Sequence, residues 1–255
     1  MESRIEVHKT VGILGGMGPE AGCSFYQRLI ELTPASIDQD HLKVILYSPC
    51  QIPDRSNYLA GTGPSPIPDL VKAVSDLSRW GAQVIAIPCN TAHYFFDDMQ
   101  RALPPGVQLL HIVEETAQGI LQEMGKGVRV GLLGTRSTIR HGLYQEPLKR
   151  RGLELILPDA HMQEDVQKSI DLLKAGHAHF AKATRLLQEA LANLASHGAQ
   201  AAVFGCTELG LVEEDLSTRL KLFDSVDLLA RATLRAARQS SSRRPAPAEA
   251  SASHS

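Results

Sequence analysis

The chain has 255 residues, of which 43% are hydrophobic and 21% charged, and its formal net charge at pH 7 is −2. This length holds one large domain or two of about 110 residues, and either can bury a substantial core. The small net charge excludes an electrostatic footprint for nucleic acid or a membrane surface. No apolar run approaches the roughly 18 residues of a membrane span, and residues 1–6 contain no apolar signal region. We therefore expect a cytoplasmic protein whose four cysteines are free thiols.

Short apolar runs alternate with helical patterns along the chain. Residues 11–14 are typical of a buried strand, and Gly-Gly-Met-Gly-Pro follows at 15–19, where Pro19 suits the start of a helix. Further strands are expected at 43–47, 84–87, 109–113, 128–133, 153–157, 203–204 and 220–223. Helices are expected at 19–32, 69–80, 114–124, 144–151, 166–173, 179–196 and 225–238. This alternation predicts an α/β fold with mainly parallel sheets flanked by helices.

Two stretches of the sequence repeat each other. Residues 81–91 read GAQVIAIPCNT and residues 198–208 read GAQAAVFGCTE, which places their cysteines 117 positions apart. Val-Gly-Ile-Leu-Gly at 11–15 matches Val-Gly-Leu-Leu-Gly 119 positions later, and Tyr26-Gln27 matches Tyr144-Gln145 at 118. Matches at nearly one offset indicate a duplicated half. We expect two pseudo-symmetric α/β domains, 10–106 with 218–238 and 107–217, followed by a disordered tail at 239–255.

Each copy of the repeat ends a strand in a cysteine, Cys89 or Cys206. Ligands of open α/β sheets bind beyond the carboxyl ends of the strands, so both thiols should face one cleft. Asn90 is a predicted helix N-cap, and a helix N-terminus favours the thiolate. Two thiols that flank a carbon can remove a proton from one face and return one to the other. A single cysteine at a strand end is often a small core residue, so the pair carries this hypothesis. Cys23 is expected in the core, and Cys50 near the pocket without a role.

Four motifs give the chain a resemblance to a known family. They are Gly-Gly-Met-Gly-Pro at 15–19, Gln-Ile-Pro-Asp-Arg at 51–55, Pro-Cys-Asn-Thr-Ala-His at 88–93 and Gly-Cys-Thr-Glu at 205–208. With them the chain resembles the cofactor-independent aspartate/glutamate racemase superfamily, and within it the aspartate racemases, over about residues 11–236. The resemblance implies an active site in the cleft between two domains, Cys89 and Cys206 as acid and base, and interconversion of L- and D-aspartate. It also implies that no pyridoxal phosphate or other cofactor is used, and that the protein is a homodimer.

The resemblance further implies which residues contact the substrate. Asn90, Thr91 and Ala92 match donors to the α-carboxylate, and Arg55 and Lys174 match positions that hold the side-chain carboxylate. Other residues expected at the site are Met17, Gln51, Thr135, Ser137, Thr138, Thr207 and Glu208. From the residues alone, the favoured interpretation of Arg55 is an ion pair with Asp54, and that of Lys174 is a favourable charge at a helix C-terminus. The alternative for Glu208 is an exposed first-turn glutamate. The sequence contains no closely spaced Cys/His set typical of zinc, so no metal is expected.

Several alternatives remain open. The Asp-Ser-Gly opening and Gly-Cys-Thr-His closing usual in glutamate racemases are absent, which disfavours glutamate, and a decarboxylase of the superfamily would need only the second cysteine. A racemase of glutamate or of many amino acids, and a non-catalytic amino-acid-binding protein of the same fold, are the main alternatives. A nucleotide binder is a third, because residues 16–21 fit Gly-x-Gly-x-x-Ala after a strand. The second predicted strand, however, ends without an acidic residue to bind a ribose.

Overall fold

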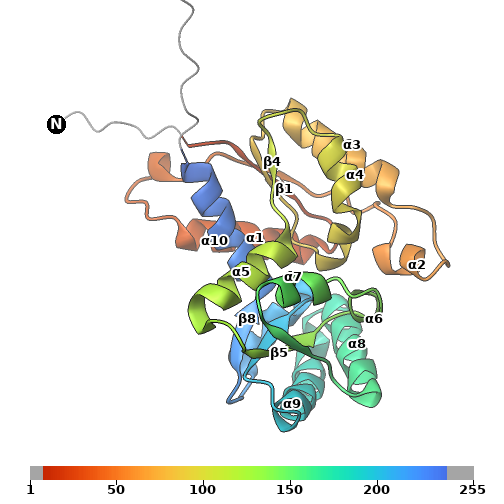
Figure 1. Ribbon diagram of the computed structural model, residues 1–255. Helices are drawn as coiled ribbons and strands as arrows, with labels where there is room; N and C mark the ends of the chain where they lie inside the picture. The colour runs from red at the N-terminus through yellow and green to blue at the C-terminus, as the bar shows by residue number, and fades with distance from the viewer. Residues whose placement is uncertain (1–7, 240–255) are drawn as a thin grey trace, which may run out of the picture.

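Two parallel four-stranded sheets form the framework of the computed structural model, which describes residues 8–239 (Figure 1). The first sheet has the order β2 (Val44–Tyr47), β1 (Val11–Leu14), β3 (Val84–Ala86) and β4 (Gln108–Leu109). The second has the order β6 (Glu154–Ile156), β5 (Arg129–Leu133), β7 (Ala201–Phe204) and β8 (Lys221–Asp224). Each sheet thus places the strands of its half in the same order. The predicted α/β fold with two parallel sheets is confirmed.

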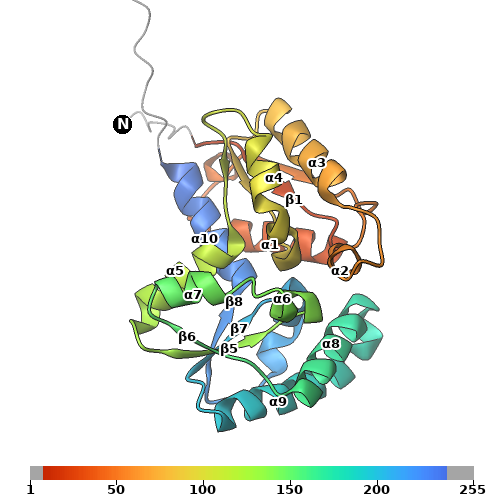
Figure 2. The same cartoon turned by 45° about the vertical axis from the view of Figure 1, so that its right-hand side comes forward.

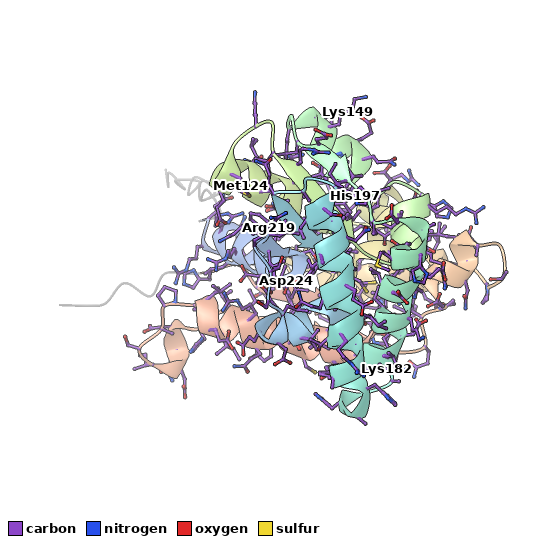
Figure 3. All side chains as sticks on the ribbon, turned by 90° about the horizontal axis from the view of Figure 1, so that it is seen from below. Met124, Lys149, Lys182, His197, Arg219 and Asp224 are labelled. Carbon is purple, nitrogen blue, oxygen red and sulfur yellow. The ribbon has the colours of Figure 1, made fainter. Side chains whose placement is uncertain are left out.

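Three helices lie between the two sheets: α1 (Pro19–Leu32), α5 (Ile112–Met124) and α10 (Ser225–Arg238) (Figure 2). One hydrophobic cluster contains Ile13 of β1, Val130 of β5 and Leu229 of α10, so this central layer joins both halves. Separate clusters cover the outer faces, where α3 (Ile67–Arg79) and α4 (Phe96–Arg101) pack on the first sheet. The second sheet is covered by α8 (Ala160–Lys174) and α9 (Phe180–Ser196), which run side by side in Figure 3.

Short helices occupy the connections that follow the strands. They are the 3₁₀ helices η1 (Asp38–Asp40), η2 (Asn90–Phe95), η3 (His177–His179) and η4 (Thr207–Asp215), together with α2 (Arg55–Leu59), α6 (Arg136–Arg140) and α7 (Gln145–Arg150). β1 and β7 are buried along their whole length, as parallel strands covered by helices on both faces must be. The loops after β1, β3, β5 and β7 therefore gather at the carboxyl ends of the two sheets.

Some expected boundaries differ from those observed. The apolar run 109–113 is divided between β4 and the first turn of α5, because a short apolar run does not distinguish a strand from a buried helix. β4 pairs within the first sheet, although the predicted limits placed residues 107–217 in the second domain. β8 pairs within the second sheet, although residues 218–238 were predicted to belong to the first domain. The division into domains stays a prediction.

Cys23 is exposed on α1, so its expected place in the core is wrong. The predicted disordered tail lies outside the described residues apart from Gln239, and no described helix has the length and apolarity to cross a membrane.

The turn after β1 requires glycine at position 16. Gly16 has a φ of +85°, and a Cβ added there would lie 2.8 Å from the carbonyl carbon of Pro49. Gly61 has a similar φ of +75°, but a Cβ added at Gly61 would have nothing within 4 Å of it. We expect Gly16→Ala to lower the free energy of unfolding by about 1–3 kcal/mol more than Gly61→Ala does, because both variants carry the φ strain and Gly16→Ala also meets backbone. Urea denaturation of both variants measures the difference, and equal losses would contradict this account of the turn.

Candidate active site

Cys89 lies in the turn that links β3 to η2, and its residue exposure is 6%. The next residue, Asn90, does not cap the helix as expected, because its side chain is engaged elsewhere. Asn90 Nδ2 donates to Ser225 Oγ at 2.9 Å, and Asn90 Oδ1 accepts from the Tyr144 hydroxyl at 2.6 Å. The capping prediction is therefore wrong, since partners from distant segments take both ends of the amide.

Cys206 occupies the matching turn after β7 and is likewise 6% exposed. Its Sγ donates to Glu208 Oε2 at 3.0 Å, and the Thr207 hydroxyl donates to the same oxygen at 3.2 Å. Burial, and then the charge of Glu208, raise the pKa of the Cys206 thiol well above its usual range. The expectation of a favoured thiolate is wrong for Cys206, because burial and a neighbouring carboxylate outweigh the start of a 3₁₀ helix.

Glu208 is itself buried, so the alternative of an exposed first-turn glutamate is excluded. We expect Glu208→Gln to lower the pKa of Cys206, because the substitution removes a negative charge next to the forming thiolate. Thiolate absorbance against pH, in a chain with Cys23, Cys50 and Cys89 replaced by serine, measures this shift. The control is Glu213→Gln, which replaces a half-buried glutamate farther along η4. This substitution should leave the Cys206 titration unchanged. An unchanged or raised pKa of Cys206 in Glu208→Gln would contradict the assigned role of Glu208.

Lys174 and Arg55 are the two cations of the expected site. Lys174, at the end of α8, has its Nζ 4.0 Å from Glu208 Oε1. Its side chain is 40% exposed, so loss of solvation opposes its charge only in part, and the fields of Glu208, Cys206 and Cys89 together raise the pKa of Lys174. Lys174 therefore stays protonated next to Glu208. Figure 2 shows this end of α8 rising toward α2 of the first half.

Arg55 is buried at the start of α2, with an exposure of 8%. Its guanidinium donates to the carbonyls of Pro53 at 3.3 Å and Met17 at 3.4 Å, while its buried Nε has no partner. The alternative ion pair with Asp54 is not formed, because Asp54 Oδ1 accepts from the Asn57 N–H at 2.7 Å and caps α2. Across residues 8–239, Arg55 forms no salt bridge with any carboxylate. A buried cation without an acidic partner is suited to an anionic ligand.

A cluster of threonine hydroxyls joins the two halves. Thr135 caps α6 by accepting from the Thr138 N–H at 3.1 Å, and the two hydroxyl oxygens are 3.0 Å apart. Thr138 Oγ1 lies 3.5 Å from Thr91 Oγ1, which belongs to the Cys89 turn. Ala92 and Ser137 are buried beside them. The structure therefore brings together Thr91, Thr135 and Thr138 of the expected pocket residues, whereas Thr207 bonds Glu208 on the Cys206 side.

The glycine-rich turn after β1 closes the site from the first half. A Cβ at Gly18 would lie 3.5 Å from Glu208 Oε1, so this turn reaches the Cys206 side. Met17 is buried and accepts from Arg55 through its carbonyl, whereas Gln51 is exposed in the loop before α2. His177 Nε2, after α8, lies 3.2 Å from Glu20 Oε1 in the first turn of α1 and adds a contact between the halves.

Two buried residues of this region, Tyr144 and Ser225, were not predicted as part of the site. Both contact Asn90, and the Ser225 hydroxyl donates to the carbonyl of Phe204, two residues before Cys206, at 2.7 Å. The repeat of Tyr26 at Tyr144 was the one signal in the sequence that pointed to Tyr144. Ser225, at the start of a predicted helix, had none beyond its position. Among the described residues, no group of three or more His, Cys, Asp or Glu side chains is placed to hold a metal ion.

A large cavity of about 1420 Å³ lies elsewhere, between α1, α5, α10 and β8. Arg28, Glu115 and Asp227 are among its lining residues, and of the expected site residues it touches Thr207. Because the cavity contains neither Cys89 nor Cys206, we place the reactive site at the cysteine turns instead.

Comparisons with known proteins identify relatives over most of the chain. The family model described as "Asp/Glu/Hydantoin racemase" matches residues 14–233. The broad specificity amino-acid racemase RacX of Bacillus subtilis is 34% identical over 232 residues, which cover 88% of this chain and 96% of RacX. Among solved structures, the Picrophilus torridus aspartate racemase aligns with a TM-score of 0.78 and 30% identity, over 90% of this chain and 94% of that one. An aspartate racemase homologue from Pyrococcus horikoshii OT3 aligns at 0.69 and 28%, over 90% and 99%.

Proposed function

The chain belongs to the Asp/Glu/hydantoin racemase family, and from that premise we propose that it interconverts L- and D-aspartate with Cys89 and Cys206 as acid and base. Family membership makes the protein an amino-acid racemase. The proposal adds the substrate and the residues. The observation that carries it is the pair of buried thiols in matching turns. Arg55, which is buried without a carboxylate partner among residues 8–239, and Lys174, which lies next to Glu208, support it.

In the proposed reaction, the thiolate of one cysteine takes the α-proton of the substrate. The electron pair of the broken C–H bond delocalises into the α-carboxylate, and the thiol of the other cysteine gives its proton to the opposite face of the carbon. One proton leaves and one arrives, so thiol and thiolate have exchanged places and no redox partner or cofactor is needed. The difficult step is the weak acidity of the α-proton, which donors around the developing enediolate must offset.

The donors are assigned to the Cys89 turn and to the turn after β5, which begins α6. The backbone N–H groups of Asn90 and Thr91 head η2, and the hydroxyls of Thr91, Thr135 and Thr138 lie close to one another at the junction of the halves. Because the Asn90 amide is engaged by Tyr144 and Ser225, its proposed contact with substrate is through its backbone. Ala92 donates its N–H to the Cys89 carbonyl at 3.2 Å, so its proposed contribution is to the wall of the pocket. Met17, Ser137, Thr207 and Gln51 remain proposed lining residues.

Aspartate is proposed as the substrate because its side-chain carboxylate would be the acidic partner that the Arg55 guanidinium lacks. A planar guanidinium binds a carboxylate in a two-pronged geometry, and burial strengthens that pair. Lys174 adds a second positive charge near the same site. The similarity to the Picrophilus torridus aspartate racemase supports the same substrate.

A panel of L-amino acids incubated with purified protein and no added cofactor tests the proposal, with the D-isomers separated by chiral chromatography. We expect kcat/KM for aspartate to exceed that for glutamate by about 10- to 200-fold, the usual worth of one methylene in a fitted pocket. Neutral amino acids should react more slowly still. Turnover of glutamate in preference to aspartate, or no turnover of any amino acid, would overturn the assignment.

A broad-specificity racemase is the second candidate, favoured by the 34% identity to RacX. Such an enzyme would accept neutral and cationic side chains at rates close to that of aspartate. The same panel separates the two candidates, because the Arg55 account predicts a steep preference for an acidic side chain.

We further propose that the protein is a homodimer. Each chain would fold into two domains, 10–106 with 218–238 and 107–217, and the two domains would close over the substrate. Tyr26 and Ile30 of α1 are exposed apolar side chains that line a surface hollow together with Val44 of the edge strand β2, and they support an interface there. Light scattering should give a mass near twice the 27.7 kDa of one chain, and a monomeric mass would contradict the dimer.

A further inference from the structure

A chain of buried hydrogen bonds connects the two cysteine turns. The Tyr144 hydroxyl donates to Asn90 Oδ1 at 2.6 Å, Asn90 Nδ2 donates to Ser225 Oγ at 2.9 Å, and Ser225 Oγ donates to the Phe204 carbonyl at 2.7 Å. Tyr144, Ser225 and Phe204 are fully buried, and Asn90 is 2% exposed. We call these three side chains and the Phe204 carbonyl the Asn90 bridge.

The direction of every bond in the Asn90 bridge follows from its end point. A carbonyl only accepts, so the Ser225 hydroxyl must donate to Phe204 and accept from Asn90. The Asn90 amide therefore turns its nitrogen to Ser225 and its oxygen to Tyr144, whose hydroxyl must donate. Burial raises the pKa of Tyr144, which keeps that hydroxyl protonated. The network has one consistent arrangement and no exposed member.

The ends of the Asn90 bridge are adjacent to the reactive groups. Asn90 follows Cys89 directly, and Phe204 is two residues before Cys206. Tyr144 precedes α7, and Ser225 is the first residue of α10, which packs between the sheets. The bridge thus ties the turn of one thiol, in the first half, to the strand of the other thiol, in the second half.

Resting on the proposed two-thiol reaction, we propose that Asn90, Tyr144 and Ser225 are positioning residues that set the separation of Cys89 and Cys206. Proton transfer at opposite faces of one carbon requires both sulfur atoms to be within reach of that carbon at the same time. A displacement of about 1 Å in a reacting group lowers the rate of such a transfer steeply. When the second thiol is displaced, the carbanion is reprotonated by the thiol that formed it. If that thiol has exchanged its proton with the solvent, the α-hydrogen is exchanged without inversion.

The test compares exchange with inversion in D₂O. Proton NMR follows loss of the α-proton of L-aspartate, and chiral chromatography follows formation of D-aspartate. In Tyr144→Phe and Ser225→Ala we expect kcat for inversion to fall by about 10- to 100-fold and the ratio of exchange to inversion to rise. A variant that only unfolds part of the population lowers both rates together and leaves their ratio unchanged.

Matched controls remove a hydroxyl that is outside the Asn90 bridge. Thr233→Val deletes a fully buried hydroxyl of α10 that donates to the Leu229 carbonyl, and Tyr26→Phe alters the repeat partner of Tyr144. Both should keep the wild-type ratio. A wild-type ratio in folded Tyr144→Phe and Ser225→Ala would overturn the proposal.

A second readout does not depend on turnover. Hydrogen–deuterium exchange followed by mass spectrometry should show faster amide exchange in both 88–95 and 204–209 for either variant of the Asn90 bridge, whereas Thr233→Val should affect α10 alone. Faster exchange confined to the neighbourhood of the substituted residue would contradict the coupling of the two turns. If the wild-type protein racemises no amino acid, the proposed function fails while this experiment still decides whether the bridge couples the turns.

Discussion

Cys89→Ser and Cys206→Ser should each lower racemisation of aspartate by about a thousandfold or more, because a serine hydroxyl is a far weaker acid and its alkoxide is inaccessible at neutral pH. Both positions are buried, and serine is close to cysteine in size, so the fold should be retained. Chiral assays of the two variants, alongside circular dichroism, measure the loss and the integrity of the fold.

The chain supplies its own controls for this experiment. Cys23 and Cys50 are exposed, and neither lies in a repeated cysteine turn. Cys23→Ser and Cys50→Ser should therefore retain wild-type kcat. Full turnover in Cys89→Ser or Cys206→Ser would rule out the two-thiol mechanism.

Arg55→Ala should cut kcat/KM for aspartate by about 30-fold or more, the cost of deleting one partner of a buried charge pair. The guanidinium is held by the carbonyls of Pro53 and Met17 and is otherwise unpaired, so the substrate carboxylate is its expected partner. Kinetics with aspartate and with alanine, which lacks the side-chain carboxylate, separate a lost ion pair from a damaged site.

Arg101→Ala is the matched control for Arg55→Ala. Arg101 is exposed at the end of α4 and pairs with Asp98 on its own helix, so its loss should leave aspartate kinetics unchanged. If Arg55→Ala also left aspartate kinetics unchanged, Arg55 would have no place in the substrate site.

Much of the fold was predictable because the information is local. Buried parallel strands appear as continuous apolar runs, and Pro19 and Gly81 mark a helix start and a helix end. The offset repeat predicted two sheets with equivalent cysteine turns, as observed. The predicted strand at 109–113 was wrong in part, because apolarity alone does not distinguish a strand from the buried first turn of a helix.

The details of the site depend on contacts between distant segments. Asn90 has the side chain of a typical N-cap, but Tyr144 and Ser225, 54 and 135 positions away, take its amide. The pKa of Cys206 follows from burial and from the orientation of Glu208, neither of which spacing in the sequence reveals. In the sequence, Asp54 is a plausible ion-pair partner for Arg55, but in the structure its carboxylate caps α2 instead.

The central claim is that two thiols act on opposite faces of one carbon. The most direct measurement is a single partial conversion of L-aspartate in D₂O, stopped early, with the deuterium content of each isomer determined by mass spectrometry. We expect the D-aspartate formed to carry deuterium at the α-carbon while the remaining L-aspartate keeps its proton, because each face is served by its own thiol. Early deuterium in the remaining L-aspartate at the same level as in the product would show that one group serves both faces, and would contradict the account.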